Sequence, residues 1–289
     1  AHAVWDAVFM AISVFNNAGF VILPGGLEPH VTDWWMLVPI ILGTTVGAIG
    51  FPVIMDVAKN LRAPRRWRLH TKLTLSTYLI LAFIGALALA LTEWHNPATL
   101  GSVDTPSKIL NAMLAGVNSR SSGLSALNVG AMHSQTHFVQ DILMMIGGGS
   151  ASTAGGVKVT TFAVLVLAVI AEARGDRDIE TFGRRIPTST VRLAVAVSLL
   201  GLAMVAISVV LLLTMTDHSL DIILFETVSA FATVGLSTGV TPNLPVAAKY
   251  VLIALMFAGR TGSMTVAAAL ALRERSRVIR MPEEQPIIG

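Results

Sequence analysis

Five long apolar stretches set the first limit on how this chain can fold. A helix needs about 20 apolar residues to cross a bilayer, and we predict membrane spans over 34–57, 73–93, 138–171, 191–214 and 246–271. Apolar residues make up 54% of the chain and charged residues only 13%, against about 25% charged residues in typical soluble domains. The pattern predicts an all-α polytopic membrane protein and excludes an ordinary soluble enzyme or a disordered chain.

The Lys and Arg residues are concentrated in three segments that alternate with the predicted spans. Fifteen of the 20 lie in 59–72, 173–192 and 273–289, whereas the segments on the other side hold only Lys108 and Arg120. Basic loops stay on the cytoplasmic side of a membrane. The distribution therefore predicts a multi-pass plasma-membrane protein with basic cytoplasmic loops. It favours topology over nucleic-acid binding as the reason for the sequence pI of about 9.6.

Motifs of common enzymes and metal centres are missing from the sequence. It has no cysteines, which excludes disulfides, thiolate metal sites and cysteine nucleophiles. It also has no HExxH motif, nucleophile elbow or dinucleotide fingerprint. His133 and His137 have the i, i+4 spacing of metal ligands, but without a third ligand nearby we expect interfacial residues. The sequence predicts a protein that is not an enzyme and has no resident cofactor.

A six-residue pattern with glycine in fifth place occurs three times. These repeated loops are FNNAGF at 15–20, SRSSGL at 119–124 and FATVGL at 231–236. Each follows about twelve residues of helical apolar pattern, at 5–15, 107–118 and 220–230, which are too short to span and are predicted to be half-helices. A second glycine comes 24 residues after each loop glycine, at Gly43, Gly147 and Gly259. The unit that repeats is a span, a half-helix, a loop and a span.

Loops of this kind at membrane depth need a special environment. Irregular backbone is tolerated there only where it lines a water-filled cavity or is buried in protein. Its carbonyl oxygens can replace the hydration shell of a monovalent cation, and glycine permits the backbone angles. We therefore predict an ion pore with a selectivity filter made by the three repeated loops. The predicted filter residues are Asn16, Asn17, Ala18, Gly19, Ser121, Ser122, Gly123, Thr233, Val234 and Gly235.

The third apolar stretch is interrupted at 147–156 by five glycines, two serines and a threonine. Such a run does not sustain a helix in the middle of a span. A phosphate-binding P-loop is excluded, because Walker A motifs place Gly directly before Lys-Ser/Thr, whereas Gly156, Val157, Lys158 and Val159 follow one another here. A plain flexible kink is the alternative to a functional loop.

These motifs resemble the pore subunit of the Trk/Ktr/HKT superfamily of potassium transporters, most closely its bacterial KtrB/TrkH branch. The resemblance covers essentially the whole chain. It is carried by the loop at 15–20 and by GGGSASTAGGVK at 147–158, AFATVGLSTG at 230–239 and MFAGRTG at 256–262. The TVG at 233–235 is also similar to the filter of tetrameric potassium channels. The resemblance implies potassium uptake by channel-like permeation, with K⁺ bound at the filter residues only.

The resemblance also implies how the chain is divided. Family members have four repeats around a pseudo-fourfold pore, and the three loops here correspond to the second, third and fourth. We expect the second repeat at 1–58, the third at 59–172, the fourth at 173–272 and a cytoplasmic tail at 273–289. The first repeat and the first helix of the second are expected to lie outside this chain.

The expected partners follow from the same resemblance. It implies a homodimer in the lipid bilayer and a cytosolic nucleotide-binding regulatory ring, which contacts the basic segments and the tail. No nucleic acid is expected, and a role for Na⁺ as an activator stays open. The loop at 119–124, which belongs to the expected third repeat, departs from the family pattern Arg-Thr-Ala-Gly-Phe, because Ser121 and Ser122 follow Arg120. That departure bears on fine selectivity between K⁺ and Na⁺.

The resemblance assigns gating to the interrupted third span, which would lie beneath the filter. The expected gating residues are Gly147, Gly148, Gly149, Ser150, Ser152, Thr153, Gly155, Gly156, Lys158 and Arg260. A charge within a span usually faces a cavity or a partner, and the family implies that Arg260 contacts the interrupted segment. Three acids, Asp6, Asp221 and Glu226, are expected to raise the local cation concentration if they lie near a cation entrance. For Asp6 and Asp221, which lie near half-helix starts, a cap of the helix N-terminus is the slightly preferred alternative.

Alternatives from other classes stay open. One is a sodium-conducting transporter, or a sodium-coupled one with broken helices, although no carboxylate occurs within 145–160. Another is a non-conducting fragment. An intramembrane hydrolase is disfavoured, because Ser150 and Ser152 have no histidine at similar depth on any predicted span.

Overall fold

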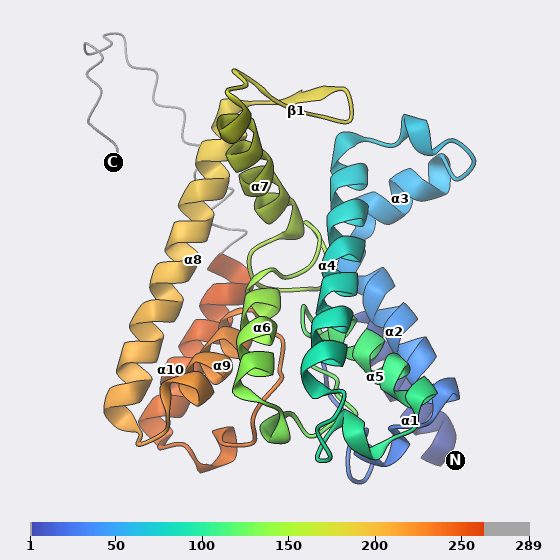
Figure 1. The fold of residues 1–289 in the computed structure, drawn as a ribbon, viewed down its shortest axis with the longest axis vertical. Coiled ribbons are helices and arrows are strands. Elements are labelled where there is room, and N and C mark those ends of the chain that lie inside the picture. Colours follow the sequence, from blue (N-terminus) through green and yellow to red (C-terminus); the bar gives the residue numbers. More distant parts are fainter. Residues whose placement is uncertain (1, 263–289) are drawn as a thin grey trace.

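The computed structural model describes residues 2–262, which form a helical protein with a small β-hairpin (Figure 1). Its longest helices are α4 (Leu69–Glu93) and α8 (Thr188–Met215). The others are α1 (His2–Phe15), α2 (Trp34–Ile49), α3 (Phe51–Lys59), α5 (Thr105–Asn118), α6 (Ser134–Met145), α7 (Val159–Arg174), α9 (Leu220–Phe231) and α10 (Val246–Phe257), which continues into a π-helix at Ala258–Gly262. The hairpin pairs β1 (Ile179–Thr181) antiparallel with β2 (Arg184–Ile186) at one end of the molecule.

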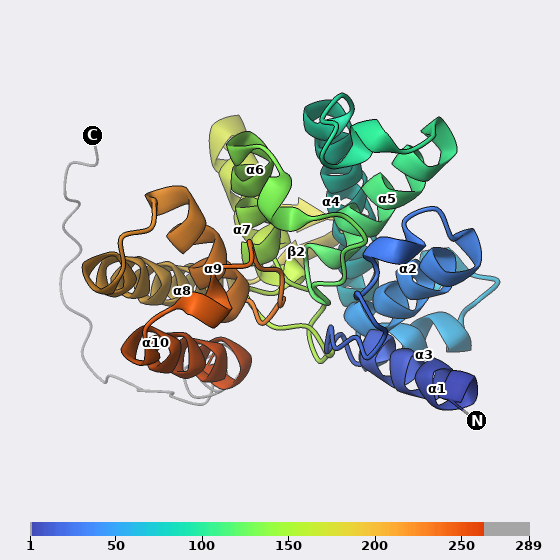
Figure 2. The same ribbon diagram turned by 90° about the horizontal axis from the view of Figure 1, so that it is seen from below.

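Short helices occur where the sequence predicts half-helices. α1, α5 and α9 contain 14, 14 and 12 residues. Each ends at a repeated loop, and irregular chain then leads to α2, α6 or α10. Viewed from below, α1–α3, α4–α7 and α8–α10 lie side by side around the loops (Figure 2).

Two of the described helices, α4 and α8, are long and apolar enough to cross a membrane, and α2 with α3 can form a third, bent span. A continuous helix over 34–57 is wrong, because the axis turns by 95° between α2 and α3. Gly50 lies at the bend with φ 95°, and Pro52 cannot donate the hydrogen bond that would continue α2. Not all five predicted spans are therefore continuous helices.

Two further predicted spans, 138–171 and 246–271, differ from the predicted continuous helices, each for its own reason. The stretch 138–171 is divided into α6 and α7 by residues 146–158, which we call the intramembrane loop, at the predicted glycine run. The stretch 246–271 begins with α10 but extends past residue 262, and the tail at 273–289 lies outside the described residues.

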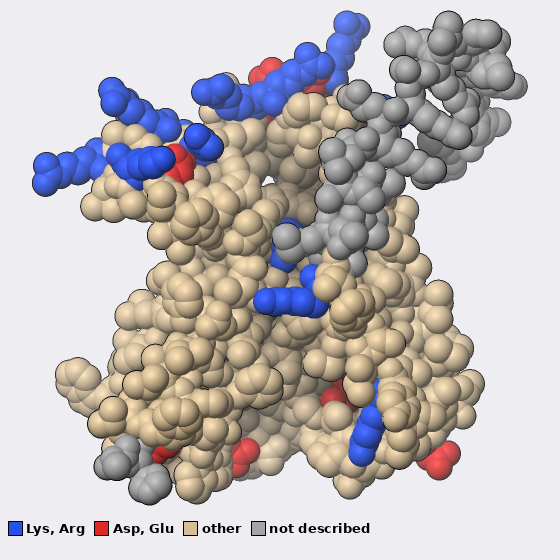
Figure 3. Space-filling model, turned by 180° about the vertical axis from the view of Figure 1, so that it is seen from behind, with Lys and Arg blue, Asp and Glu red and all other residues tan. Residues whose placement is uncertain are grey.

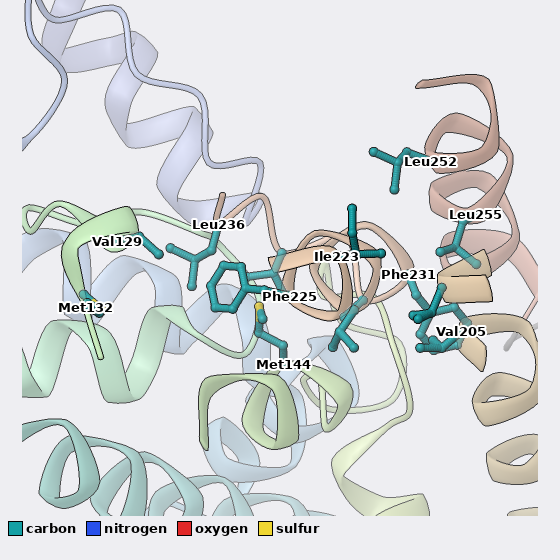
Figure 4. Packing of buried hydrophobic residues seen from close by; sticks show 14 of the residues in the cluster. Val129, Met132, Met144, Val205, Ile223, Phe225, Phe231, Leu236, Leu252 and Leu255 are labelled. Carbon is teal, nitrogen blue, oxygen red and sulfur yellow. The ribbon is translucent and has the colours of Figure 1, made fainter. Parts of the chain in front are cut away.

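The largest apolar core surrounds α9. Ile223, Phe225 and Phe231 of this helix are at most 1% exposed. They pack among side chains from neighbouring helices, including Met144 of α6 and Val205 of α8 (Figure 4). A second core joins α1, α2 and α5 with the loop after α5. The half-helices are thus held by tertiary packing, which short helices need for stability.

Apolar side chains also cover much of the outside. Phe83 and Leu91 of α4 and Leu202 of α8 are 58–74% exposed, as expected of helix faces that meet lipid. The Lys and Arg side chains visible in Figure 3 gather mainly at the end that carries the hairpin. The predicted cytoplasmic segments 59–72 and 173–192 both lie at this end.

Helices α4 and α5 pack closely through small residues. Gly116 of α5 lies against the α4 backbone, where a methyl group would come 2.6 Å from the nitrogen of Ala86. Gly85 of α4 lies against Gly116 in turn, because a methyl group on Gly85 would come 3.1 Å from the Cα atom of Gly116. Small residues let membrane helices approach in this way, and this contact fixes α5 and the loop that follows it.

We predict that Gly116→Val destabilises the folded protein by about 2 kcal/mol, because the added methyls force the two helices apart. The measurement is the thermal unfolding midpoint in detergent. Ala203→Val on the exposed face of α8 is the matched control and should leave the midpoint within the error. An equal midpoint for Gly116→Val would refute the close packing.

Candidate functional site

The three repeated loops meet backbone to backbone. A methyl group on Gly19 would lie 3.3 Å from the carbonyl carbon of Ser122 and 3.7 Å from the carbonyl oxygen of Val234. One on Gly123 would lie 2.8 Å from the carbonyl carbon of Gly235. A side chain at either glycine would therefore collide with the next loop. The structure brings the predicted filter residues of all three loops together.

The N–H groups of these loops are directed back to the half-helices. After α1 and α9, two successive loop N–H groups donate to carbonyls three and five residues earlier, at 2.9–3.1 Å. After α5, the N–H groups of Ser121, Ser122 and Gly123 all donate to the Asn118 carbonyl, at 3.2–3.3 Å. Within residues 2–262, no carbonyl oxygen of a predicted filter residue accepts a hydrogen bond. Free carbonyls are thus collected where the loops meet.

One side-chain hydrogen bond recurs in all three loops. A polar side chain near the end of each half-helix donates to the carbonyl directly after the repeated glycine. The bonds run from Ser13 Oγ to Phe20 (2.8 Å), from Asn118 Nδ2 to Leu124 (2.8 Å) and from Ser229 Oγ to Leu236 (2.6 Å). These donors were not predicted from the sequence. The available signal was a polar residue five or six positions before each glycine.

The loop glycines Gly19, Gly123 and Gly235 line part of a cavity of about 370 Å³. Polar groups of Ser125, Asn128, Ser237 and Thr238 are among its lining residues. The cavity therefore gives a polar approach to the free carbonyls.

Glu226 of α9 anchors the chain that follows the last loop. Its carboxylate accepts hydrogen bonds from Ser237 Oγ (2.9 Å), from the Thr238 N–H (2.7 Å) and from Thr241 Oγ1 (2.5 Å), and the residue is 4% exposed. Glu226 is therefore a buried support of its own loop rather than an open acid at an entrance. This changes the role expected from the sequence.

The two other acids differ from each other. Asp221 lies in the first turn of α9 and accepts from Ser134 Oγ at 3.2 Å and from Ser219 Oγ. Asp6 lies in the second turn of α1, which begins at His2. An N-terminal cap at Asp6 is therefore wrong.

Backbone hydrogen bonds hold the intramembrane loop at both ends. The Gly147 N–H donates to the Val157 carbonyl at 2.8 Å, and the Gly149 N–H donates to the Ala48 carbonyl at 2.8 Å. The Val159 N–H donates to the Gly148 carbonyl at 3.0 Å. The loop is thus closed on itself and joined to the end of α2.

Side chains of the intramembrane loop add local support. The hydroxyls of Ser150 and Thr160 are 2.9 Å apart, and Ser152 Oγ donates to the Gly149 carbonyl at 2.6 Å. Lys158 Nζ donates to the Ala154 carbonyl at 2.6 Å, within the same loop. The loop is ordered by contacts of its own, which argues against a plain flexible kink.

The intramembrane loop touches the repeated loops through Thr153. Asn17 Nδ2 donates to Thr153 Oγ1 at 2.5 Å, and Ser121 Oγ donates to Asn17 Oδ1 at 2.9 Å. Arg260 Nη1 donates to the Thr153 carbonyl. The structure therefore joins two repeated loops, the intramembrane loop and Arg260 in one hydrogen-bonded chain.

Two glycines of the intramembrane loop lie against the last repeated loop. A methyl group on Gly155 would lie 3.1 Å from Cβ of Thr233. One on Gly156, whose φ is 68°, would lie 3.3 Å from Cβ of Ala232. The absence of side chains at these two positions lets the segment pass directly beside the loop.

The two histidines have different partners, and no group of three side chains that could hold a metal ion occurs within the described residues 2–262. His133 Nδ1 lies 3.1 Å from Glu93 Oε1. His137 Nε2 lies 2.8 Å from the Val129 carbonyl, and the residue is 5% exposed. An interfacial role for His137 is therefore wrong, because it belongs to the packing between α6 and α9.

The apolar helices and the three loops that meet between them are consistent with a polytopic membrane protein, and comparison with known proteins identifies the family. Residues 1–279 match the family described as TrkH, cation transport protein. The chain belongs to this family.

Several named proteins are similar over nearly the whole chain. The Ktr system potassium uptake protein B of Bacillus subtilis is 40% identical over all of this chain and 64% of its own length. The protein of the same name from Vibrio alginolyticus is 34% identical over 98% of this chain and 62% of its own. The Enterococcus hirae potassium/sodium uptake protein NtpJ is 33% identical over 100% and 65%. The chain thus spans just under two thirds of these relatives.

The crystal structure of the potassium transporter TrkH from Vibrio parahaemolyticus has the same fold. The two superpose with a TM-score of 0.71 over 93% of this chain and 58% of that one, at 17% sequence identity. At this identity the likeness concerns the fold alone.

We predict that Ser229→Ala weakens the last repeated loop by about 1–2 kcal/mol, because the Leu236 carbonyl loses its buried donor. Hydrogen exchange of the 231–236 segment should become faster, and the unfolding midpoint should fall. Ser76→Ala is the control, since Ser76 Oγ donates to Lys72 within α4. Unchanged exchange in the 231–236 segment would contradict the role of Ser229.

Proposed function

We propose that this chain forms three sides of a potassium pathway and contributes to potassium uptake across the plasma membrane by channel-like permeation. The observation that carries the proposal is the meeting of three repeated loops whose carbonyl oxygens accept no hydrogen bond within residues 2–262. Such oxygens can replace the water around a monovalent cation. K⁺ is the transported substrate, at the ten predicted filter residues.

Permeation needs binding that is favourable but weak. Backbone carbonyls are neutral, so they can coordinate K⁺ without the strong attraction of a carboxylate. Glu226, the buried acid of α9, is already engaged by hydroxyl and N–H donors of its own loop. The neutral, carbonyl-lined filter supports passage of ions rather than tight storage.

The proposed gate is the intramembrane loop at 146–158. Two observations support a position of the intramembrane loop across one side of the proposed filter: the contact of Thr153 with the repeated loops, and the approach of Gly155 and Gly156 to the last of these loops. In this position it obstructs an ion that leaves the filter, and displacement of the loop opens the route. Arg260 supports the closed state by its bond to Thr153.

The wider organisation follows the family. We propose five membrane crossings and three pore loops, with the second repeat at 1–58, the third at 59–172 and the fourth at 173–272. The basic loops face the cytoplasm of a bacterial cell. The complete protein forms a homodimer in the bilayer and binds a cytosolic nucleotide-binding regulatory ring, without nucleic acid.

Sodium conduction is the second candidate. It is favoured by the serines at 121 and 122, which depart from the family pattern, and one relative is named as a potassium/sodium uptake protein. The two candidates differ in competition between ions, so one flux experiment separates them.

We expect the full-length gene product in liposomes to take up rubidium, with excess K⁺ but not Na⁺ as an effective competitor. Gly235→Ser should lower uptake roughly tenfold, because a side chain is strained at the φ of 95° that Gly235 adopts. Gly239→Ser is the matched control, since Gly239 has φ 93° and open surroundings but lies outside the filter. Equal competition by Na⁺ would favour the sodium candidate. No uptake by folded dimer would contradict conduction by the membrane subunit alone and would point to an obligatory gating partner or a non-conducting scaffold.

We predict that Arg260→Ala raises rubidium uptake by roughly tenfold, because a charge-assisted hydrogen bond of about 1.5 kcal/mol no longer holds the loop closed. The control is Lys249→Ala, which removes a cation of α10 that donates to the Pro242 carbonyl away from the loop. Lower uptake at a normal yield of folded Arg260→Ala protein would exclude this gating role.

A further inference from the structure

Arg120 is a buried cation without an ionic or hydrogen-bonded partner among the described residues. It is 0% exposed, and Nε, Nη1 and Nη2 make no hydrogen bond. Its guanidinium lies face-on over the ring of Tyr78, with 3.6 Å from Cζ to the ring centroid. Tyr78 belongs to α4 and is 1% exposed. The aromatic face is therefore the contact that holds the charge.

A charge in this environment is unusual. Arginine is rarely buried without a carboxylate or a set of acceptors, because desolvation of the ion is expensive. A cation–π contact offsets only part of that cost. An apolar side chain of similar size would pack in the same space at a lower cost. The retention of the charge needs a reason beyond packing.

The location of Arg120 gives that reason. It directly precedes Ser121, whose hydroxyl bonds to Asn17, and Ser122, whose carbonyl lies against Gly19. The equivalent residues of the other two loops are the neutral Asn16 and Ala232. One of the three repeated loops therefore carries a fixed positive charge on the residue that directly precedes its free carbonyls in the chain.

We infer that Arg120 is a positioning residue that sets the cation affinity of the proposed filter. The Tyr78 ring holds the guanidinium in place. The positive charge of the guanidinium repels a cation that is bound by the carbonyls of the loop at 119–124. The ion consequently binds less tightly and leaves sooner. This inference rests on the proposed function, since it requires cations at the repeated loops.

The expected size follows from distance. Arg120 lies two residues before Ser122, which separates their Cα atoms by at most about 7 Å. The arginine side chain adds its own length, so the guanidinium lies on the order of 10–15 Å from an ion at the Ser122 carbonyl. At that distance, with the intermediate dielectric suited to buried protein sites, the repulsion corresponds to about a tenfold change in the dissociation constant. Removal of the charge should tighten ion binding by that factor.

The experiment measures ion binding at equilibrium rather than flux. The thermal midpoint of the full-length protein in detergent is followed as RbCl is titrated at constant ionic strength, which gives an apparent dissociation constant for Rb⁺. We expect Arg120→Gln to lower that constant about tenfold and Arg120→Lys to keep it near the wild-type value. Tyr78→Phe retains the ring face and should also behave as wild type.

Lys108→Gln is the matched control. Lys108 also lies over an aromatic ring, with Nζ 5.0 Å from the Trp94 centroid, but belongs to the start of α5 rather than to the repeated loop. Its removal should leave the Rb⁺ constant unchanged. An effect equal to that of Arg120→Gln would show that the two cations act alike from any distance, which overturns the inference.

The outcomes separate the inference from the proposed function. Wild-type protein that is not stabilised by Rb⁺ overturns both. Stabilised wild-type protein with an unchanged constant in folded Arg120→Gln overturns the inference alone. If Arg120→Gln does not fold, a second variant, Asn16→Lys, adds a positive charge at the equivalent residue of the loop at 15–20. It should raise the apparent dissociation constant for Rb⁺ about threefold. An unchanged constant in that variant also overturns the inference.

Discussion

Peptide groups without hydrogen bonds are costly inside a membrane, and the repeated loops are built around that cost. Their N–H groups donate back to the ends of the half-helices, and a polar side chain at each end holds the carbonyl that follows the glycine. Within residues 2–262, the carbonyl oxygens of the predicted filter residues then accept no hydrogen bond where the loops meet. The close packing of α4 with α5, and of α9 with its neighbours, is what maintains this arrangement.

Much of this arrangement could be predicted from the sequence. Residue spacing identified the half-helices, the repeated glycines and the interruption at 147–156, because these depend on local pattern. The bend at Gly50 was missed, although glycine and proline flank Phe51, since the apolar pattern continues on both sides. Local pattern carries no information about the direction in which a helix continues after a break.

Tertiary contacts account for the other differences. His137 was expected at an interface, but α9 covers it, and its ring lies 4.9 Å from that of Phe225. Arg120 was one basic residue in an outer segment, and its stacking on Tyr78 depends on how α4 and α5 meet. The roles of Ser13, Asn118 and Ser229 required the loop conformation to be known. Each of these depends on residues far apart in the chain.

Thr153 has a consequence for the energetics of the whole assembly. Its side chain accepts from Asn17 of one repeated loop, and its backbone accepts from Arg260 beyond α10. A displacement of Thr153 therefore changes the surroundings of Asn17, and a change at Asn17 acts back on Thr153. By thermodynamic linkage, ligand occupancy at the repeated loop that contains Asn17 and the conformation of the segment that contains Thr153 influence each other by the same free energy. If the proposed function holds, a cation among the carbonyls is itself an effector of the proposed gate at 146–158.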